Sequence, residues 1–271
     1  MNRRHFLGVA GAGAIVSGLS GCGPAKLSTA AAPRIPSPDA FPPIMPVHAR
    51  ADRIFRVTVC LRPFRAAGPR LEVESVGDKT VVHNYGHGGS GWSLSWGSSA
   101  IAVEHAMAAA GGEREVAVIG CGALGLTSAI LLQRAGARVT IYAKERPPDV
   151  RSARATGSWT PDSRIALANS ASPDFPALWE KMCRSSFQMY QSYLGMAGNP
   201  VEWTDRYSLY DRNSVERHAH PPTPQPQEDL EFAHYMNRVR DLTPRATEFG
   251  PGTHPFPTQY ATRTASLTFN V

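Results

Sequence analysis

The chain has 271 residues, 42% of them hydrophobic, so it can bury the core of one large domain or two ordinary ones and is not wholly disordered. Its formal net charge of +6 comes from Lys and Arg residues spread along the chain, without a run of five or interleaved aromatic residues. This distribution argues against a nucleic-acid-binding protein.

The N-terminus, MNRRHFLGVAGAGAIVSGLSGC, has the pattern of an export signal. Its apolar part is shorter and richer in glycine than the roughly 20 apolar residues of a membrane span. The paired Arg3 and Arg4 resemble a Tat signal, and Leu-Ser-Gly-Cys resembles a lipobox whose Cys22 becomes lipidated. An ordinary cleaved signal with an incidental Cys22 is the alternative. Both predict an exported protein, in the periplasm or on the extracytoplasmic membrane surface, which meets the membrane only through its signal or lipid anchor.

Residues 23–50 are rich in Pro and Ala and are expected to form an extended linker. Ordered structure is expected from Arg53, with short strands in RIFRVTVCLRPFR, RLEVESV and KTVVHNYG, followed by a helix from Ser95 to Ala110. No two of the later cysteines have CxxC spacing, so we expect no metal site and no disulfide framework. These cysteines, Cys60, Cys121 and Cys183, are expected to be buried as small hydrophobic residues.

A βαβ unit is the strongest pattern in the chain: EVAVIGCGALGLTSAILLQRAGARVTIYAKE. We expect a fully buried strand at Val116–Ile119, an amphipathic helix at Leu124–Arg134 that ends at Gly136, and a second parallel strand at Val139–Tyr142. Further along, a helix is expected at 177–194, a loop at HAHPPTPQPQ, and a strand beginning in TRTASLTFNV.

The turn of this unit matches G-x-G-x-x-G through Gly120, Gly122 and Gly125. The first glycine allows a tight turn, the second brings backbone N–H groups to a pyrophosphate, and the third lets helix and strand pack closely. Glu145, beside Lys144, stands where an acidic residue would hold the adenosine ribose. A dinucleotide is therefore expected, and the unit alone leaves NAD and FAD both open.

A second glycine-rich run, VVHNYGHGGSGWSLSWGSSA, resembles the signature of the D-amino-acid oxidase family. Upstream, LRPFRAAGPRLEVE resembles the segment before that signature; downstream, YAKERPPD and ATGSWTP resemble the family's strand end and its Trp-Thr-Pro turn. The resemblance implies FAD as cofactor and an α/β fold: a Rossmann-like FAD-binding domain with a parallel sheet, plus the start of an incomplete α+β substrate domain.

The resemblance also implies roles for single residues. Arg62 would hold the substrate carboxylate, with Arg65 as a competitor for that role. The backbone N–H groups of the run that contains Gly89 would face the pyrimidine end of the flavin, where negative charge accumulates on reduction. His83 and His87 are expected to be structural, because hydride transfer to a flavin needs no protein base. Tyr85 fits either the site or the core. The residues expected to bind the cofactor are Gly88, Gly89, Ser90, Gly91, Trp92, Ser93, Gly120, Gly122, Ala123, Leu124, Gly125, Lys144, Glu145, Gly157, Trp159 and Thr160.

The chain departs from the family in two respects. Compared with the family, the two glycine runs occur in the opposite order, as in a circular permutation. Such a rearrangement is possible when the two ends of a domain lie close together. The chain also stops where the family continues into its substrate domain, so a fragment or an open pocket is expected. The expected organisation is a signal (1–22), a linker (23–50), an FAD-binding domain (51–165) and a partial substrate region (166–271).

The function expected is oxidation of a D-amino acid to an imino acid, with oxygen reduced to hydrogen peroxide. One alternative is an FAD enzyme that acts on another amine or amino acid, or that passes electrons to an acceptor other than oxygen. The others are a flavin-binding envelope lipoprotein without activity and a nicotinamide dehydrogenase. The substrate's identity and the oligomeric state are left open.

Overall fold

The computed structural model describes residues 50–112, 114–213, 230–252, 256 and 258–270. These belong to one compact unit, Ile44–Val271. The expected export signal, its Cys22, nearly all of the linker and the HAHPPTPQPQ segment lie outside the described residues.

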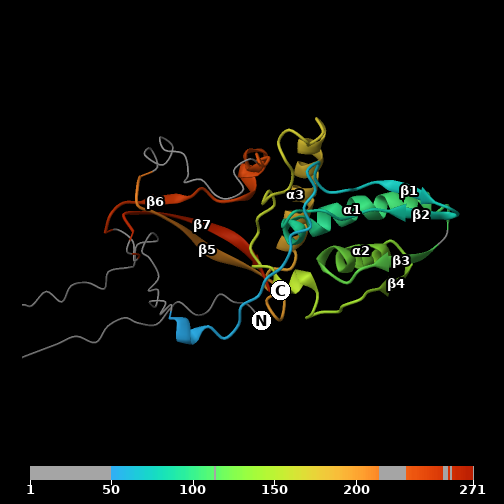
Figure 1. Ribbon diagram of the computed structural model, residues 1–271, viewed down its shortest axis with the longest axis horizontal. Coiled ribbons are helices and arrows are strands. Elements are labelled where there is room, and N and C mark those ends of the chain that lie inside the picture. Colours follow the sequence, from blue (N-terminus) through green and yellow to red (C-terminus); the bar gives the residue numbers. More distant parts are fainter. Residues whose placement is uncertain (1–49, 113, 214–229, 253–255, 257, 271) are drawn as a thin grey trace, which may run out of the picture. The chain divides into compact units, whose positions relative to one another are not determined.

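The βαβ unit consists of strand β3 (Glu115–Ile119), helix α2 (Ala123–Arg134) and strand β4 (Arg138–Tyr142) (Figure 1). The strands pair in parallel from Glu115↔Arg138 to Ile119↔Tyr142, which confirms the predicted unit. The helix ends before Gly136, whose φ of +87° favours glycine.

The expectation that the first strand is fully buried is wrong. Only Val118 of β3 is buried, and Ile119 is 89% exposed. Parallel strands become buried when helices cover both faces. Here the described sheet has only these two strands, and the apolar contacts of Val116, Val118 and Val139 are with α1 and α2.

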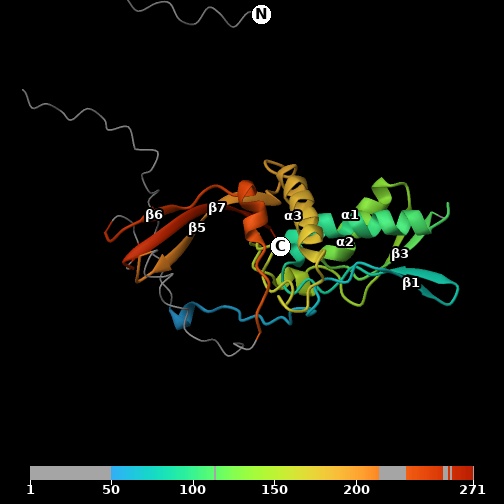
Figure 2. The same cartoon turned by 90° about the horizontal axis from the view of Figure 1, so that it is seen from above.

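Helix α1 (Gly91–Ala109) packs along α2, and the two helices run in the same direction (Figures 1 and 2). Near their N-termini the contact is polar: the Ser99 hydroxyl lies 2.8 Å from that of Thr127. Farther along it is apolar, between Val103 and Leu132. The helix begins four residues before the predicted Ser95, because the serines of its first turns are buried against neighbouring elements.

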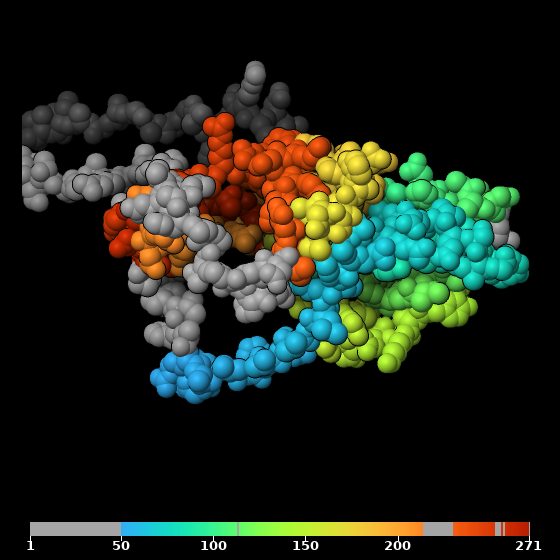
Figure 3. Space-filling model, turned by 45° about the horizontal axis from the view of Figure 1, so that its top comes forward, coloured from blue at the N-terminus to red at the C-terminus, as the bar shows by residue number. Residues whose placement is uncertain are grey.

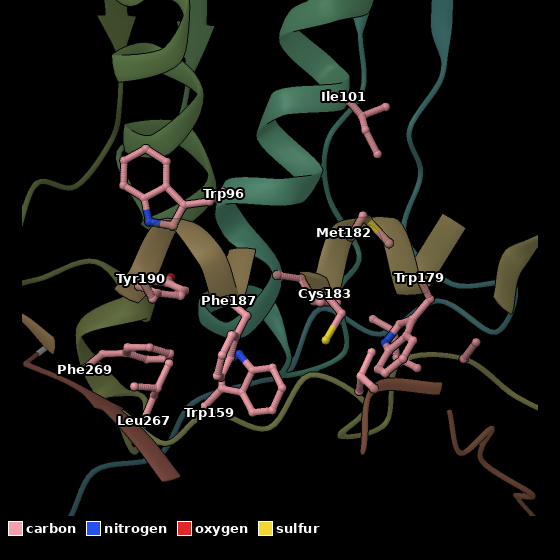
Figure 4. Close-up of a cluster of buried hydrophobic side chains, with 14 of the residues drawn as sticks. Trp96, Ile101, Trp159, Trp179, Met182, Cys183, Phe187, Tyr190, Leu267 and Phe269 are labelled. Atoms are coloured by element: carbon pink, nitrogen blue, oxygen red, sulfur yellow. The ribbon is translucent and has the colours of Figure 1, made fainter. Parts of the chain in front are cut away.

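Helix α3 (Phe175–Gln191) lies against α1 where Gly97 meets Met182. A Cβ at Gly97 would lie 2.6 Å from the Met182 Cα, so the backbones touch, and the Gly97 N–H donates to the Ser186 hydroxyl at 2.8 Å. The predicted helix is confirmed, with both ends shifted toward the N-terminus. Around it lies the main core, which includes Trp96, Trp159, Trp179, Met182, Phe187, Leu267 and Phe269 (Figure 4).

A second sheet contains β5 (Val201–Tyr210), β7 (Tyr260–Phe269) and β6 (Thr247–Phe249), antiparallel and in the order β5-β7-β6. The strand expected in TRTASLTFNV is thus confirmed as part of β7. Leu267 and Phe269 of β7 are buried in the main core, which therefore draws on residues from both sides of the expected boundary at 165. That boundary stays a prediction.

The residues before α1 form a short 3₁₀ helix η1 (Ala51–Arg53) and a hairpin of β1 (Val73–Val76) and β2 (Lys79–Val82). The strand predicted in RIFRVTVCLRPFR is wrong: residues 54–63 have no strand partner and are exposed (Figure 3). The burial expected for the cysteines is correct for Cys183 and wrong for Cys60, which is exposed, while Cys121 is half-buried. No helix in the described part of the chain is long and apolar enough to cross a membrane.

Candidate functional site

The first turns of α1 and α2 meet at one residue, Ser152, in the 3₁₀ helix η2 (Arg151–Arg154). The Trp92 indole N–H donates to the Ser152 carbonyl at 2.9 Å, and the Ala123 N–H donates to the Ser152 hydroxyl at 2.9 Å. A helix N-terminus carries N–H groups without intrahelical partners and a partial positive charge. Two such N-termini side by side favour an anionic ligand such as a pyrophosphate.

The glycine turn between β3 and α2 combines an open backbone with close packing. Gly120 has φ +106° and donates its N–H to the Tyr142 carbonyl at 2.8 Å, and a Cβ there would have nothing within 4 Å. A Cβ at Gly125, in contrast, would lie 2.8 Å from the Gly120 carbonyl carbon. The packing expected of the third glycine is therefore present, and Gly120 leaves room for a ligand beside the turn.

Lys144 and Glu145 follow the end of β4 and are exposed. Because β3 and β4 are parallel, the ends of both strands lie at the same edge of the sheet as the glycine turn. Leu124, in the first turn of α2, is half-buried, and its carbonyl accepts from the Ser99 hydroxyl at 3.3 Å. The two charged residues thus stand at the edge where a ribose next to the bound phosphates would be held.

Arg62 lies directly against the second glycine run. A Cβ at Gly89 would lie 2.8 Å from the Arg62 guanidinium carbon, and Gly89 has φ +125°. The Arg62 Nη1 donates to the Ser163 hydroxyl at 3.4 Å. Gly88 packs in the same way on the backbone of Arg164: a Cβ at Gly88 would lie 2.9 Å from the Arg164 carbonyl carbon. The fold therefore brings Arg62, Gly89 and Ser163 together from three distant parts of the sequence.

Arg65, the competitor for the role of Arg62, is held elsewhere. Its Nε donates to the Gly68 carbonyl at 3.3 Å, its side chain packs on Gly86, and its guanidinium lies 5.6 Å from the centre of the Tyr85 ring. Tyr85 itself is 42% exposed and is not a core residue. Of the two arginines, Arg62 is the one beside Gly89.

Hydrogen bonds tie the start of α1 to the loop that carries Trp159 and Thr160. The Ser90 hydroxyl donates to the Thr160 carbonyl at 2.9 Å, and the Thr160 N–H donates to the Ser93 hydroxyl at 2.7 Å. These hydroxyls are buried, so the groups that α1 can offer a ligand are backbone N–H groups at Gly91, Trp92 and Ser93.

Gly157 and Trp159, both expected at the cofactor, lie in the core. Gly157 has φ +71°, and a Cβ there would lie 2.5 Å from the Phe269 carbonyl oxygen. The Trp159 ring is 3% exposed and meets Phe187 edge-on at 5.1 Å. The Trp159 indole N–H is buried without a partner among the described residues, so a bound group could supply one.

The histidines of the second run are bound within the structure. The Nε2 atom of the buried His87 is hydrogen-bonded to the Ser98 hydroxyl, with the two atoms 2.9 Å apart. Burial lowers the pKa of the His87 imidazole to about 3. His83 contacts the Glu74 carboxylate at 2.7 Å, and that contact, with Arg70 nearby, lowers the pKa of Glu74. Both histidines have the structural roles expected of them. Within the described residues, no group of three His, Cys, Asp or Glu is arranged to hold a metal.

Ser152, Ser163 and Arg164 are site residues that sequence reasoning missed. Each reaches the glycine runs through tertiary contact, and neither their spacing nor their residue types give a local signal. The described residues nevertheless fit the expected FAD: a turn that is open at Gly120, two helix N-termini for its phosphates, and an acidic residue at the strand end. At Gly122 the Ser152 hydroxyl lies 2.8 Å from where a Cβ would be, and it accepts the Ala123 N–H.

A comparison with protein families matches residues 115–260 to the family described as "FAD dependent oxidoreductase". Among curated proteins, D-aspartate oxidase of Talaromyces thermophilus is 60% identical over 37 residues, 13% of this chain and 10% of that protein. D-amino-acid oxidase of Dictyostelium discoideum is 54% identical over 50 residues, 18% of this chain and 14% of that protein. The chain thus aligns with only a small part of these relatives, and no solved structure matches it.

The family match starts at the first residue of β3 and extends through α3 into β7, farther toward the C-terminus than the expected FAD-binding domain, residues 51–165. It covers more than half of the 271 residues. The chain therefore belongs to the FAD dependent oxidoreductase family, in agreement with its resemblance to the D-amino-acid oxidases, and FAD is its cofactor.

Proposed function

We propose that this oxidoreductase oxidises a D-amino acid. The Cα–H leaves as a hydride and the amino group becomes an imine, which water converts to a 2-oxo acid and ammonia. FAD supplies the hydride acceptor, and oxygen takes up the two electrons with two protons to give hydrogen peroxide. The observation that carries the proposal is the Arg62 guanidinium placed against Gly89 at the start of α1.

Arg62 would bind the substrate carboxylate. A guanidinium forms two parallel hydrogen bonds to a carboxylate, and these fix the orientation of the α-carbon as well as the position of the charge. No ion pair joins Arg62 to a carboxylate of the described residues, so its charge is available to a substrate. Its contact with Gly89 supports a substrate carboxylate bound next to the N-terminus of α1.

The N–H groups at the start of α1 would stabilise negative charge on the group bound there. No basic side chain is needed beside them, because holding the Cα–H bond close to the acceptor accounts for much of the rate. The surroundings of His87 agree: it is 1% exposed, and its low pKa reflects burial rather than activation as a base.

Replacing Arg62 by Met tests the proposal. Loss of a charged, bidentate contact costs about 3 kcal/mol, so kcat/KM for D-alanine should fall roughly 100-fold, mostly through KM. Arg65→Met is the matched control, since Arg65 lies on Tyr85, and its kcat/KM should stay within about threefold of the parent value. Flavin absorbance should be unchanged in both variants. Equal kinetics in the Arg62→Met variant and the parent would contradict the role of Arg62.

Peroxide formation distinguishes a D-amino-acid oxidase from an FAD enzyme for another amine and from a nicotinamide dehydrogenase. Stoichiometric peroxide with D-amino acids and none with L-amino acids or simple amines is the expected result. A flavoprotein whose absorbance responds to none of these substrates would instead be a flavin-binding protein without activity.

We also propose that the protein is exported and anchored by a lipid on Cys22. The paired Arg3 and Arg4 and the Leu-Ser-Gly-Cys sequence support this proposal. The wild-type protein should sediment with membranes, whereas a Cys22→Ser variant should be released from them. Equal fractionation of the two proteins would contradict lipidation.

A further inference from the structure

Residues 160–163, which we call the site loop, are hydrogen-bonded to the start of α1 at both of their ends. The Ser90 hydroxyl lies 2.9 Å from the Thr160 carbonyl oxygen and 3.2 Å from that of Ser163. The Thr160 N–H donates to the Ser93 hydroxyl at 2.7 Å. Ser90 is completely buried, so water does not compete for its contacts. The site loop is therefore fixed relative to the first turn of α1.

Ser90 holds the site loop instead of capping its own helix. It stands at the N-cap position of α1, where a serine hydroxyl usually accepts a hydrogen bond from an N–H group of the first turn. The Ser90 side chain makes no such bond. It donates to carbonyl groups of the site loop, so it does not take up the N–H groups that α1 can offer a ligand.

The site loop contacts Arg62 through the Ser163 side chain. The Arg62 Nη1 donates to the Ser163 hydroxyl at 3.4 Å, and Arg62 also lies against Gly89, the residue next to Ser90. A closed ring of contacts thus runs from Ser90 through Ser163 to Arg62 and back to Gly89. A guanidinium that is contacted on two sides has fewer orientations open to it, which lowers the entropy cost of binding a ligand.

A hydroxyl is a suitable partner for an arginine that binds an anion. It accepts a hydrogen bond but carries no charge, so the positive charge of the guanidinium is left for a substrate carboxylate. A carboxylate in the same place would hold the guanidinium more firmly and would compete with the substrate for it. The pairing of Arg62 with Ser163 therefore provides orientation without loss of charge.

We propose that Ser90 and Ser163 are positioning residues that hold the Arg62 guanidinium at Gly89 in the orientation that binds the substrate carboxylate. Ser163 acts by direct contact, and Ser90 acts through the site loop. The role of the carboxylate rests on the function proposed above, whereas the position of the guanidinium can be measured without any substrate.

Chemical modification of Arg62 tests the positioning. Phenylglyoxal, which reacts with arginine side chains, is applied to the full 271-residue chain, and the modification of Arg62 is followed by mass spectrometry. Ser163→Ala removes the acceptor and Ser90→Ala releases the site loop, so Arg62 should react at least about threefold faster in each variant. Ser163→Asp allows an ion pair with Arg62 and should slow the reaction.

Two control variants separate positioning from stability. Ser186→Ala removes another fully buried serine hydroxyl, which accepts from the Gly97 N–H between α1 and α3. It should leave the reaction of Arg62 unchanged. Ser163→Thr keeps the hydroxyl and should behave as the parent does. Parent-like reaction of Arg62 in Ser163→Ala and Ser90→Ala would overturn the proposal, and so would equal acceleration in Ser186→Ala.

Steady-state kinetics with D-alanine test the consequence for substrate binding. KM should rise about fivefold in Ser163→Ala and Ser90→Ala and further in Ser163→Asp, with kcat within about twofold of the parent value. The effects of Ser163→Ala and Ser90→Ala should not multiply in the double variant, because both act on one guanidinium. A parent-like KM in all these variants, or a fall in kcat alone, would overturn the proposal. Faster reaction of Arg62 in a chain that oxidises no D-amino acid would support the positioning and contradict the function proposed above.

Discussion

Burial keeps the His87 imidazole uncharged in the folded protein, with its pKa lowered to about 3. In the unfolded chain a histidine has a pKa of about 6.5. Below this pH the unfolded state therefore binds a proton that the folded state does not bind. The free energy of unfolding should therefore decrease by about 2 kcal/mol from pH 7 to pH 5, from the 1.5 units between 6.5 and 5 at 1.36 kcal/mol each. Urea unfolding at several pH values measures this change.

A His87→Asn variant should lose this contribution, and its free energy of unfolding should depend less on pH by about the same 2 kcal/mol. His105→Gln is a suitable control because His105 is a half-buried residue of α1 and leaves the buried histidine in place. An unchanged pH dependence in the His87→Asn variant would show that other groups cause the acid sensitivity.

Gly125 lies in α2 and packs directly against the glycine turn that is expected to bind the cofactor. A Cβ at this position would press on the Gly120 carbonyl, and the backbone there has little room to move. Gly125→Ala should lower the free energy of unfolding by about 1–3 kcal/mol, as overpacking does, and should also reduce the FAD retained on purification. Gly250→Ala, where a Cβ has open space, should change neither quantity.

At the scale of the elements, the local patterns of the sequence predicted most of the helices and strands. The βαβ unit was predictable because its apolar runs, glycines and helix period all lie within 31 residues, 115–145. Residues 54–63 show the limit of such patterns. Their alternation is that of a strand, but a strand also needs a partner, and these residues have none in the described structure.

The crossing of α1 and α3 could not be predicted from the sequence. It depends on Gly97, where the two backbones come into contact. Gly97→Ala should lower the free energy of unfolding by about 3 kcal/mol although alanine favours helix, because the methyl group would push α3 away. Ala100→Ser, on the exposed side of the same helix, should have an effect within about 0.5 kcal/mol. Equal stability of the two variants would contradict the close contact.

At the scale of the whole molecule, the site is formed by three segments that lie far apart in the sequence: the two glycine runs and the segment that contains Arg62. Both glycine runs and Arg62 were predictable, because each belongs to a motif that the sequence contains. Ser152 and Ser163 were not, since their hydrogen bonds to Ala123 and Arg62 exist only once the chain has folded. Motifs therefore indicated the chemistry, and tertiary contacts determined which arginine lies beside Gly89.

We propose above all that this member of the FAD dependent oxidoreductase family oxidises D-amino acids. The most direct measurement is the absorbance spectrum of the purified chain, recorded without oxygen before and after addition of D-alanine or D-aspartate, with the L-enantiomers as controls. We expect flavin bands that bleach with a D-amino acid and recover when oxygen is admitted, with release of peroxide. Flavin bands that no D-amino acid bleaches would contradict the proposed activity, and a protein that binds no FAD would contradict the account of the site itself.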